Sequence, residues 1–227
     1  MIPSILPSTG PIGVFDSGYG GLTILDKIRG LMPEYDYIYL GDSARCPYGP
    51  RSFEVVYEFT LQAVSKLFEL GCPLVILACN TASAKALRTI QQINLPVIDA
   101  TRRVLGVIRP TAECIGEITR SRHVGILATA GTIKSESYLL EIHKLSPDIV
   151  VTGEACPMWV SLVENNEYQS EGADYFVKQH INRLLDKDPM IDTIILGCTH
   201  YPLLRSKIRA YMGELSLIHI SEPTRHL

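Results

Sequence analysis

Two short apolar segments of the chain share one design. Residues 74–78 and residues 193–197 are rich in aliphatic and β-branched side chains, and each segment runs directly into a cysteine, Cys79 or Cys198. A short continuous apolar run between turn signals is typical of a buried parallel strand. Open sheets of such strands bind ligands at their carboxyl ends. The pattern therefore predicts an α/β fold that carries two thiols at strand ends, where a ligand would bind.

The rest of the chain alternates between strand and helix patterns. In the first half, we expect strands at residues 12–15, 37–40, 74–78 and 96–99, and helices at 22–31, 53–70 and 82–93. In the second half, we expect strands at 123–127, 149–151 and 193–197, helices at 135–144 and 175–185, and loops at 128–132 and from Cys156 onward. Such alternation predicts mostly parallel sheets with helices on both faces.

The two halves resemble each other in layout. Gly13 and Gly125 occupy comparable places in the first strand of each half, and the two thiols follow at similar distances. We therefore expect two similar three-layer α/β domains, residues 11–100 with Cys79 and residues 101–214 with Cys198.

The end of the chain has an unusual sequence. Residues 216–225 read Ser-Leu-Ile-His-Ile-Ser-Glu-Pro-Thr-Arg, which resembles the translation of a common sequencing adapter. We therefore expect residues 215–227 to be a non-native tail and exclude them from the fold prediction. A native C-terminal segment is expected to be missing.

Composition excludes several classes of protein. A chain of 227 residues with 46% hydrophobic and 20% charged residues is typical of a globular protein, and its net charge of −3 gives no basis for binding nucleic acid or an anionic membrane. It has no apolar run near the roughly 18 residues that span a bilayer. Its first ten residues contain no Lys or Arg, unlike a secretory signal. We expect a cytoplasmic protein whose six cysteines are mostly reduced.

The loops at the strand ends contain candidate site residues. Asp16 and Ser17 follow the first strand and precede a glycine-rich turn, which lacks the third glycine of a dinucleotide site because Thr23 stands there. On pattern alone, His200, two residues beyond Cys198, fits a group that orients or protonates a reacting atom and a surface histidine equally well. On residue pattern alone, Cys79 and Cys198 fit a reactive thiol and a packed core thiol equally well. Cys72, Cys114 and Cys156 fit a structural role better, and the role of Cys46 is open.

Four motifs together resemble the glutamate racemases. They are residues 15–22 (Phe-Asp-Ser-Gly-Tyr-Gly-Gly-Leu), 47–49 (Pro-Tyr-Gly), 78–83 (Ala-Cys-Asn-Thr-Ala-Ser) and 196–202 (Leu-Gly-Cys-Thr-His-Tyr-Pro). Their order is that of the family, and the match extends from about residue 11 to residue 211. The segments 155–157 and 162–164 also fit.

The resemblance implies a cofactor-independent isomerase, an amino-acid racemase with two α/β domains and its active site in the cleft between them. It implies that Cys79 and Cys198 are the two acid/base catalysts, supported by Asp16 and His200 respectively. It implies a substrate site formed by Asp16, Ser17, Tyr48, Gly49, Asn80, Thr81, Thr199 and His200. Thr132 is a lesser candidate for holding a substrate carboxylate. No metal, nucleic acid or membrane partner is expected.

In the cell, the resemblance implies a cytoplasmic enzyme that supplies D-glutamate for peptidoglycan, and so serves cell-wall biogenesis and cell shape. Whether the chain forms a homodimer stays open. Two alternatives remain. One is a racemase of aspartate or another small acid of the same superfamily. The other is a non-catalytic protein in which Cys79, Cys198 and His200 hold zinc, which would need a fourth ligand.

Overall fold

The protein consists of two compact units, each built on one parallel sheet. The computed structural model describes residues 10–213 and 215–218. The chain passes from the first unit to the second between Val107 and Ile108. Residues 101–107, which we assigned to the second domain, belong to the first unit because they add a strand to its sheet.

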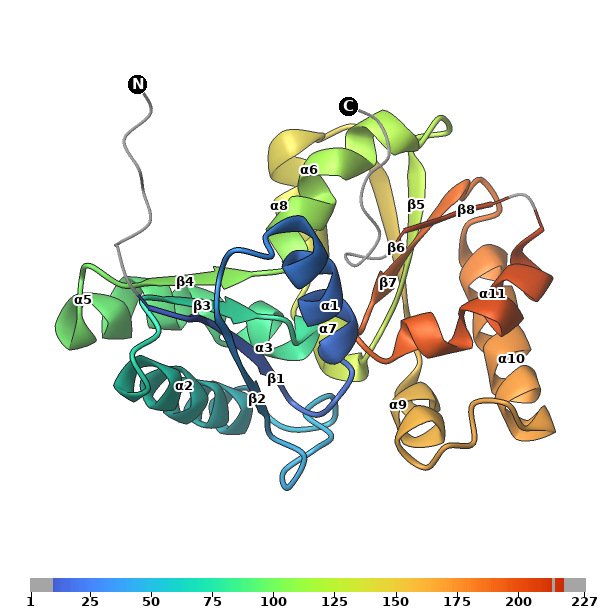
Figure 1. Ribbon diagram of the computed structural model, residues 1–227. Helices are drawn as coiled ribbons and strands as arrows, with labels where there is room; N and C mark the ends of the chain where they lie inside the picture. The colour runs from blue at the N-terminus through green and yellow to red at the C-terminus, as the bar shows by residue number, and fades with distance from the viewer. Residues whose placement is uncertain (1–9, 214, 219–227) are drawn as a thin grey trace. The chain divides into compact units, whose positions relative to one another are not determined.

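The first unit has four parallel strands in the order β2-β1-β3-β4 (Figure 1). The strands are β1 (Ile12–Asp16), β2 (Tyr37–Gly41), β3 (Leu74–Leu77) and β4 (Arg103–Gly106). Phe15 pairs in register with Leu40 on one side and with Leu77 on the other. The residues that follow β1 and β3 therefore leave the sheet at the same edge, as expected for parallel strands.

Helices cover both faces of this sheet. They are α1 (Leu22–Leu31), α2 (Phe53–Glu69), α3 (Asn80–Lys85), α4 (Leu87–Thr89), the π-helical turn η1 (Ile90–Asn94) and α5 (Leu95–Ile98). Val64 and Leu67 of α2 pack with Phe15, Val75 and Leu77 in a fully buried core. The helix α1 lies on the other face (Figure 1). Ser52 begins α2 by accepting a hydrogen bond from the Val55 N–H.

The second unit repeats this plan with the strand order β6-β5-β7-β8. Its strands are β5 (His123–Ala128), β6 (Val150–Ala155), β7 (Thr193–Gly197) and β8 (Ser216–Ile218). Its helices are α6 (Ile108–Ile118), α7 (Ala130–Lys134), α8 (Ser137–Leu145), α9 (Pro157–Glu164), α10 (Glu171–Lys187), the 3-10 turn η2 (Tyr201–Leu204) and α11 (Arg205–Met212). All pairings in both sheets are parallel, which confirms the predicted α/β class with two similar sheets.

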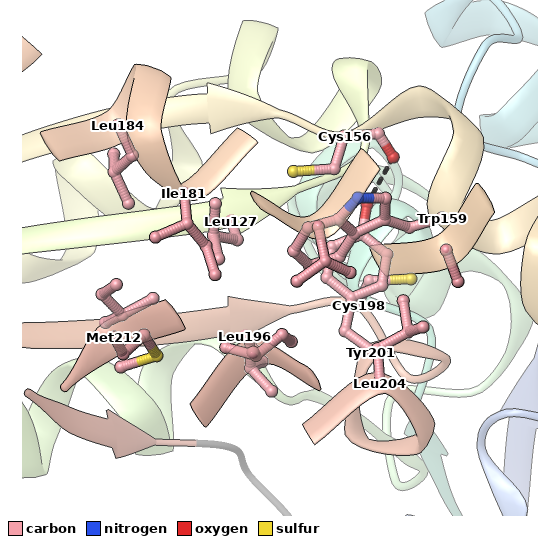
Figure 2. Close-up of a cluster of buried hydrophobic side chains, with 14 of the residues drawn as sticks. Leu127, Cys156, Trp159, Ile181, Leu184, Leu196, Cys198, Tyr201, Leu204 and Met212 are labelled. Carbon is pink, nitrogen blue, oxygen red and sulfur yellow. Dashed lines mark hydrogen bonds between the residues drawn. The ribbon is translucent and has the colours of Figure 1, made fainter. Parts of the chain in front are cut away.

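The core of the second unit lies between its sheet and the group α9, α10 and α11. Leu127 and Leu196 of the sheet pack there with Ile181 and Leu184 of α10 (Figure 2). Ile194 of β7 belongs to the same core. On the opposite face, the ring of Tyr138 from α8 lies against Gly197, where an added Cβ would stand 3.1 Å from the ring. The last residue of β7 must be small, since the aromatic ring occupies the space beside it.

Several sequence predictions were wrong in detail. Residues 96–99 are not a strand: α5 lies there, with Pro96 in its first turn, and the fourth strand comes later as β4. A short apolar run such as Val97-Ile98 does not distinguish a strand from a helical turn. The predicted loop at 128–132 contains most of α7, and the one from Cys156 begins α9, because proline is favoured in the first turn of a helix.

The end of the chain also differs from the fold prediction. Residues 216–218, which we excluded, form β8 and pair with β7, and the Leu217 side chain packs against the core. A short apolar run beside an open strand edge adds to the sheet wherever it comes from. Residues 219–227 lie outside the described part of the chain. Within the described part, no helix is both long and apolar enough to cross a membrane.

Candidate active site

Cys79 lies where β3 gives way to α3. It is the residue before the first turn of α3, and its sulfur accepts a 3.5 Å hydrogen bond from the Ala82 N–H. Its thiol points toward the Ser17 hydroxyl, with the sulfur 3.5 Å from Oγ. The side chain is only 5% exposed. The segment after β1 and the segment after β3 thus meet at Cys79, as their parallel register requires.

Asp16 is buried directly beside this thiol. Its Oδ2 accepts hydrogen bonds from the Gly18 N–H at 3.2 Å and the Gly21 N–H at 3.1 Å. A Cβ on Gly21 would lie 2.6 Å from the Asp16 Cβ, which no packed atom tolerates. The glycine-rich turn is therefore shaped to wrap around a carboxylate.

The surroundings of Cys79 disfavour its thiolate. Burial and the negative charge of Asp16 raise the pKa of Cys79 to about 11, although the hydrogen bonds from Ser17 and Ala82 oppose this rise. Without a further positive charge, the group is a neutral thiol near pH 7. It is then a proton donor, and it becomes a base only when its environment changes.

Tyr48 and Gly49 lie in the loop after β2. The Tyr48 hydroxyl donates to Asp42, which also receives the Arg45 guanidinium at 2.6 Å. Burial, followed by the bond to Asp42, raises the pKa of Tyr48 well above its usual range. Tyr48 is therefore a neutral, fixed donor whose backbone neighbour Gly49 is also buried.

Asn80 and Thr81 open α3 immediately after Cys79 and are 2% and 3% exposed. Polar side chains are rarely buried to this extent without a role in packing or binding. Asp16, Ser17, Cys79, Asn80 and Thr81 therefore form one polar group at the carboxyl edge of the first sheet.

Cys198 lies at the matching edge of the second sheet, directly after β7. Its sulfur is 3.9 Å from His200 Nδ1, and the Thr199 hydroxyl is 3.4 Å from the same nitrogen. The other ring nitrogen of His200 is hydrogen-bonded to Glu164, at the end of α9. Cys198, Thr199 and His200 are each at most 6% exposed. A carboxylate, an imidazole and a thiol thus form one connected line.

Glu164 is a further candidate site residue, which the sequence patterns do not indicate. Glu164 and His200 are 36 positions apart in the sequence, so no local spacing predicts their contact. The only available signal was that residues 162–164 fitted the family pattern.

Thr132 belongs to the same edge of the second sheet. Its hydroxyl lies 3.1 Å from that of Thr129, the residue that begins α7, and it is 2% exposed. Thr129 follows β5, which is next to β7, with Ala128 opposite Gly197. The loops that carry Thr129 and Cys198 therefore leave neighbouring strands at the same level.

The remaining cysteines are in different settings. Cys72 and Cys156 are fully buried, and burial raises the pKa of each. Burial also raises the pKa of Cys114, while Cys46 is partly exposed. Of these four, only Cys156 directly follows a strand, β6, and its side chain lies in the hydrophobic core of the second unit. Among the residues that the structure describes, no group of three or more His, Cys, Asp or Glu side chains is arranged to hold a metal ion.

Known proteins resemble this chain in sequence and in structure. The sequence profile of the Asp/Glu/Hydantoin racemase family matches residues 23–221. A glutamate racemase from Shouchella clausii is 39% identical over 215 residues, which cover 94% of this chain and 75% of the relative. The crystal structure of a glutamate racemase isoform from Bacillus anthracis is 38% identical, with a TM-score of 0.87 over 95% of this chain and 79% of that chain.

A second solved structure is informative because of its ligand. The glutamate racemase from Francisella tularensis, in complex with D-glutamate, is 37% identical with a TM-score of 0.80, covering 93% of this chain and 76% of that chain. In all these cases the likeness extends over both units, so the clusters around Cys79 and Cys198 both lie within it.

Proposed function

This chain belongs to the glutamate racemases, within the Asp/Glu/Hydantoin racemase family, and we propose that it interconverts L-glutamate and D-glutamate through Cys79 and Cys198. The enzymes of this group are isomerases that act on an amino acid. The observation that carries the proposal is the pair of strand-end thiols, each with its own buried polar partners. The relative from Francisella tularensis, crystallised with D-glutamate, supports the choice of substrate.

Two thiols suit racemisation because the α-proton leaves one face of the carbon and a proton returns on the other. In our proposal, Cys79 removes the proton from D-glutamate and Cys198 removes it from L-glutamate, each thiol acting as acid when the other acts as base. Positioned acid/base groups of this kind contribute about 10²–10⁴-fold in rate. This assignment requires the two units to bring the thiols to opposite faces of one substrate.

The environment of Cys79 suits a base that is activated by its substrate. Its pKa of about 11 keeps it protonated in the empty site. An amino acid carries an α-ammonium group, and a positive charge within about 4–6 Å favours a thiolate. Asp16 then has a double role: it holds the loop at Gly18 and Gly21, and it keeps Cys79 protonated until the substrate arrives.

On the other side, Glu164 and His200 serve Cys198. When the Glu164 carboxylate accepts from Nε2–H, the ring presents Nδ1 toward the Cys198 sulfur. His200 then accepts or returns the thiol proton. Because Glu164 is part of α9, a rigid helix rather than a flexible loop sets the orientation of the ring.

The substrate itself is held by the polar residues at the two strand edges in this proposal. Ser17, Tyr48, Gly49, Asn80 and Thr81 contribute from the first unit. Thr199 and His200 contribute from the second, with Thr132 as a further hydroxyl for a carboxylate. Backbone N–H groups at the strand ends stabilise the negative charge that develops on the carbanion.

In the cell, we propose that the chain supplies D-glutamate for peptidoglycan, the known role of the family, and so supports cell-wall biogenesis and cell shape. We also propose a cytoplasmic location, which the six free cysteines support.

We further propose a homodimer. Three apolar side chains of η1 and α5 are exposed, namely Ile93, Val97 and Ile98, and Val97 is 86% exposed. Exposed apolar side chains that lie together are typical of a surface that binds another protein. Light scattering of the purified protein tests this: a monomer at all concentrations contradicts it, and Val97→Lys is expected to split a dimer.

The test of the central proposal is racemisation in deuterated water, measured by circular dichroism and by deuterium at Cα. Cys79→Ser and Cys198→Ser are each expected to lower turnover by at least about 10²-fold. Cys72→Ser is the matched control, because Cys72 is a buried thiol just before the same strand as Cys79 but at the opposite end. If either strand-end variant keeps full turnover in both directions, the two-thiol mechanism is wrong.

Two further measurements decide the alternatives. Turnover confined to aspartate, in a panel of D-amino acids, would overturn the choice of glutamate. Stoichiometric zinc in the purified protein that is lost in Cys198→Ser would instead favour the metal-binding protein.

A further inference from the structure

Two buried side chains of the second unit, Glu154 and His180, meet the ammonium group of the half-exposed Lys187, and none of the three has a part in the mechanism above. His180 Nδ1 lies 2.7 Å from Glu154 Oε1, and the Lys187 ammonium donates to Glu154 Oε2 at 2.7 Å. Glu154 is 7% exposed and His180 is 4% exposed. Burial raises the pKa of Glu154, but the bonds from Lys187 and His180 outweigh it and leave the pKa below its usual value.

Such a cluster constrains geometry more than it adds stability. Replacing a buried ion pair by apolar side chains of the same volume is often neutral or even stabilising. Removing one partner, in contrast, leaves the other buried with one hydrogen bond fewer. The Glu154–His180 pair therefore holds the end of β6 and the middle of α10 at one fixed separation.

The indole of Trp159 connects this pair to the Cys198 segment. Its ring centroid is 6.0 Å from that of His180 and 4.8 Å from that of Tyr201, edge-on in both cases. Within the described residues, Trp159 Nε1 has no hydrogen-bond partner, so the indole is held by packing in the hydrophobic core, the two ring contacts included. Figure 2 shows Trp159 over Tyr201, with Cys198 nearby. A shift of the His180 ring would therefore move the Trp159 indole and, through it, the Tyr201 ring.

A second connection reaches Tyr201 from Glu154. The Tyr201 hydroxyl donates to the Cys156 carbonyl at 2.9 Å, and Cys156 is two residues after Glu154 (Figure 2). Tyr201 directly follows His200, the partner of Cys198. Two chains of contact, one through Trp159 and one through the β6 backbone, thus converge on the segment that carries the thiol.

We infer that the Glu154–His180 pair is a positioning element for Cys198, which acts through Trp159 and Tyr201 on the geometry of the thiol and of His200. This inference rests on the proposed function, because it assumes that Cys198 exchanges a proton with the substrate. It predicts that damage to the pair slows the proton transfer at Cys198 and leaves the transfer at Cys79 intact.

The test is His180→Gln in the full chain, assayed with L-glutamate and D-glutamate that carry deuterium at Cα. Since the two enantiomers have equal free energy, kcat/KM falls by the same factor in both directions, about 10–100-fold for a misplaced group. The isotope effect on kcat/KM separates the two steps. It rises for L-glutamate, because Cys198 removes that deuteron, and falls for D-glutamate, because the slow step then follows removal by Cys79.

His123→Gln is the matched control. His123 Nδ1 lies 2.8 Å from Asp188 Oδ2, so it is also a histidine–carboxylate pair of the second unit, but it begins β5 at the edge opposite to Cys198. This variant is expected to leave both isotope effects unchanged. A general loss of stability would affect the two variants alike, whereas positioning affects only His180→Gln.

The outcomes are distinct. Opposite changes of the two isotope effects in His180→Gln support the inference, and unchanged effects overturn it. If His180→Gln does not fold, Trp159→Phe is expected to give the same opposite changes, and its wild-type behaviour would overturn the inference equally. If Cys198→Ser racemises normally, the proposed function has failed instead, whatever His180→Gln does.

Discussion

Asp192 offers a stability test whose size follows from the structure. Its Oδ1 accepts from the hydroxyls of Thr119 at 2.7 Å and Thr193 at 2.8 Å. Its Oδ2 accepts from the backbone N–H groups of Arg120 and Ser121, both at 2.7 Å. Burial raises the pKa of Asp192, but these four hydrogen bonds outweigh it and lower the pKa to about 2. The carboxylate therefore ties the segment after α6 to the start of β7.

The energy follows from the pKa. A shift of one unit corresponds to about 1.4 kcal/mol, so the bonded carboxylate is worth at most about 2.5 kcal/mol. The side chain is partly exposed, and solvent screening reduces this to about 1–2 kcal/mol. Asp192→Asn removes the negative charge and replaces one of the two acceptor oxygens by an NH₂ donor, so we expect it to destabilise the second unit by about 2 kcal/mol at pH 7.

The pH dependence has a definite sign. The folded-state pKa lies below the unfolded value near 3.9, so the stabilisation is complete above that value. It is lost as the pH falls through the folded value of about 2. The difference between the wild type and Asp192→Asn should therefore be constant from about pH 7 to pH 5 and shrink below about pH 4.

Urea unfolding followed by tryptophan fluorescence measures this difference. Trp159 is the single tryptophan of the chain and is fully buried in the second unit, the same unit as Asp192. The control is Asp186→Asn, at an exposed position of α10, with an expected effect within about 0.5 kcal/mol. The reasoning is refuted if the two variants are equally stable at pH 7, or if the difference at pH 3 equals that at pH 7.

Three further predictions concern the site. Glu164→Gln should lower kcat/KM for both enantiomers by about 10-fold, because a neutral amide orients His200 less firmly, and unchanged kinetics would contradict the role of Glu164. Gly21→Ala should destabilise the first unit by about 1–3 kcal/mol in thermal unfolding followed by circular dichroism, since its Cβ would lie 2.6 Å from that of Asp16, and an unchanged midpoint would contradict this packing. Alkylation of Cys79 without substrate, with Cys79→Ser as the blank, should accelerate about tenfold per pH unit from pH 7 to pH 10, whereas a plateau near pH 8 would contradict its raised pKa.

The strands that carry the thiols were the most predictable part of the fold. Residues 74–78 lie between turn signals and are rich in β-branched and aliphatic side chains, a pattern that favours a buried strand over a helical turn. The resemblance drawn from four short motifs is likewise confirmed by matches that cover both units. The roles given to individual residues remain predictions.

Local sequence failed where distant parts of the chain decide the structure. Whether residues 96–99 form a strand depends on whether the sheet edge is taken by them or by residues 103–106, and it is taken by the latter. The contacts of Glu164 with His200 and of Glu154 with His180 join residues 36 and 26 positions apart. No periodicity encodes such contacts, since they depend on how α9 and α10 pack.

The chain passes from the first unit to the second between Val107 and Ile108, so each of the two proposed proton transfers can be followed on its own. Each thiol, together with its proton partner, is encoded in one uninterrupted stretch. Joining an isotope-enriched fragment to an unenriched one at that point would make one thiol's surroundings visible to magnetic resonance while the other's stay silent. Protonation of Cys79 and protonation of Cys198 would then be observed in two separate spectra, one for each enriched fragment.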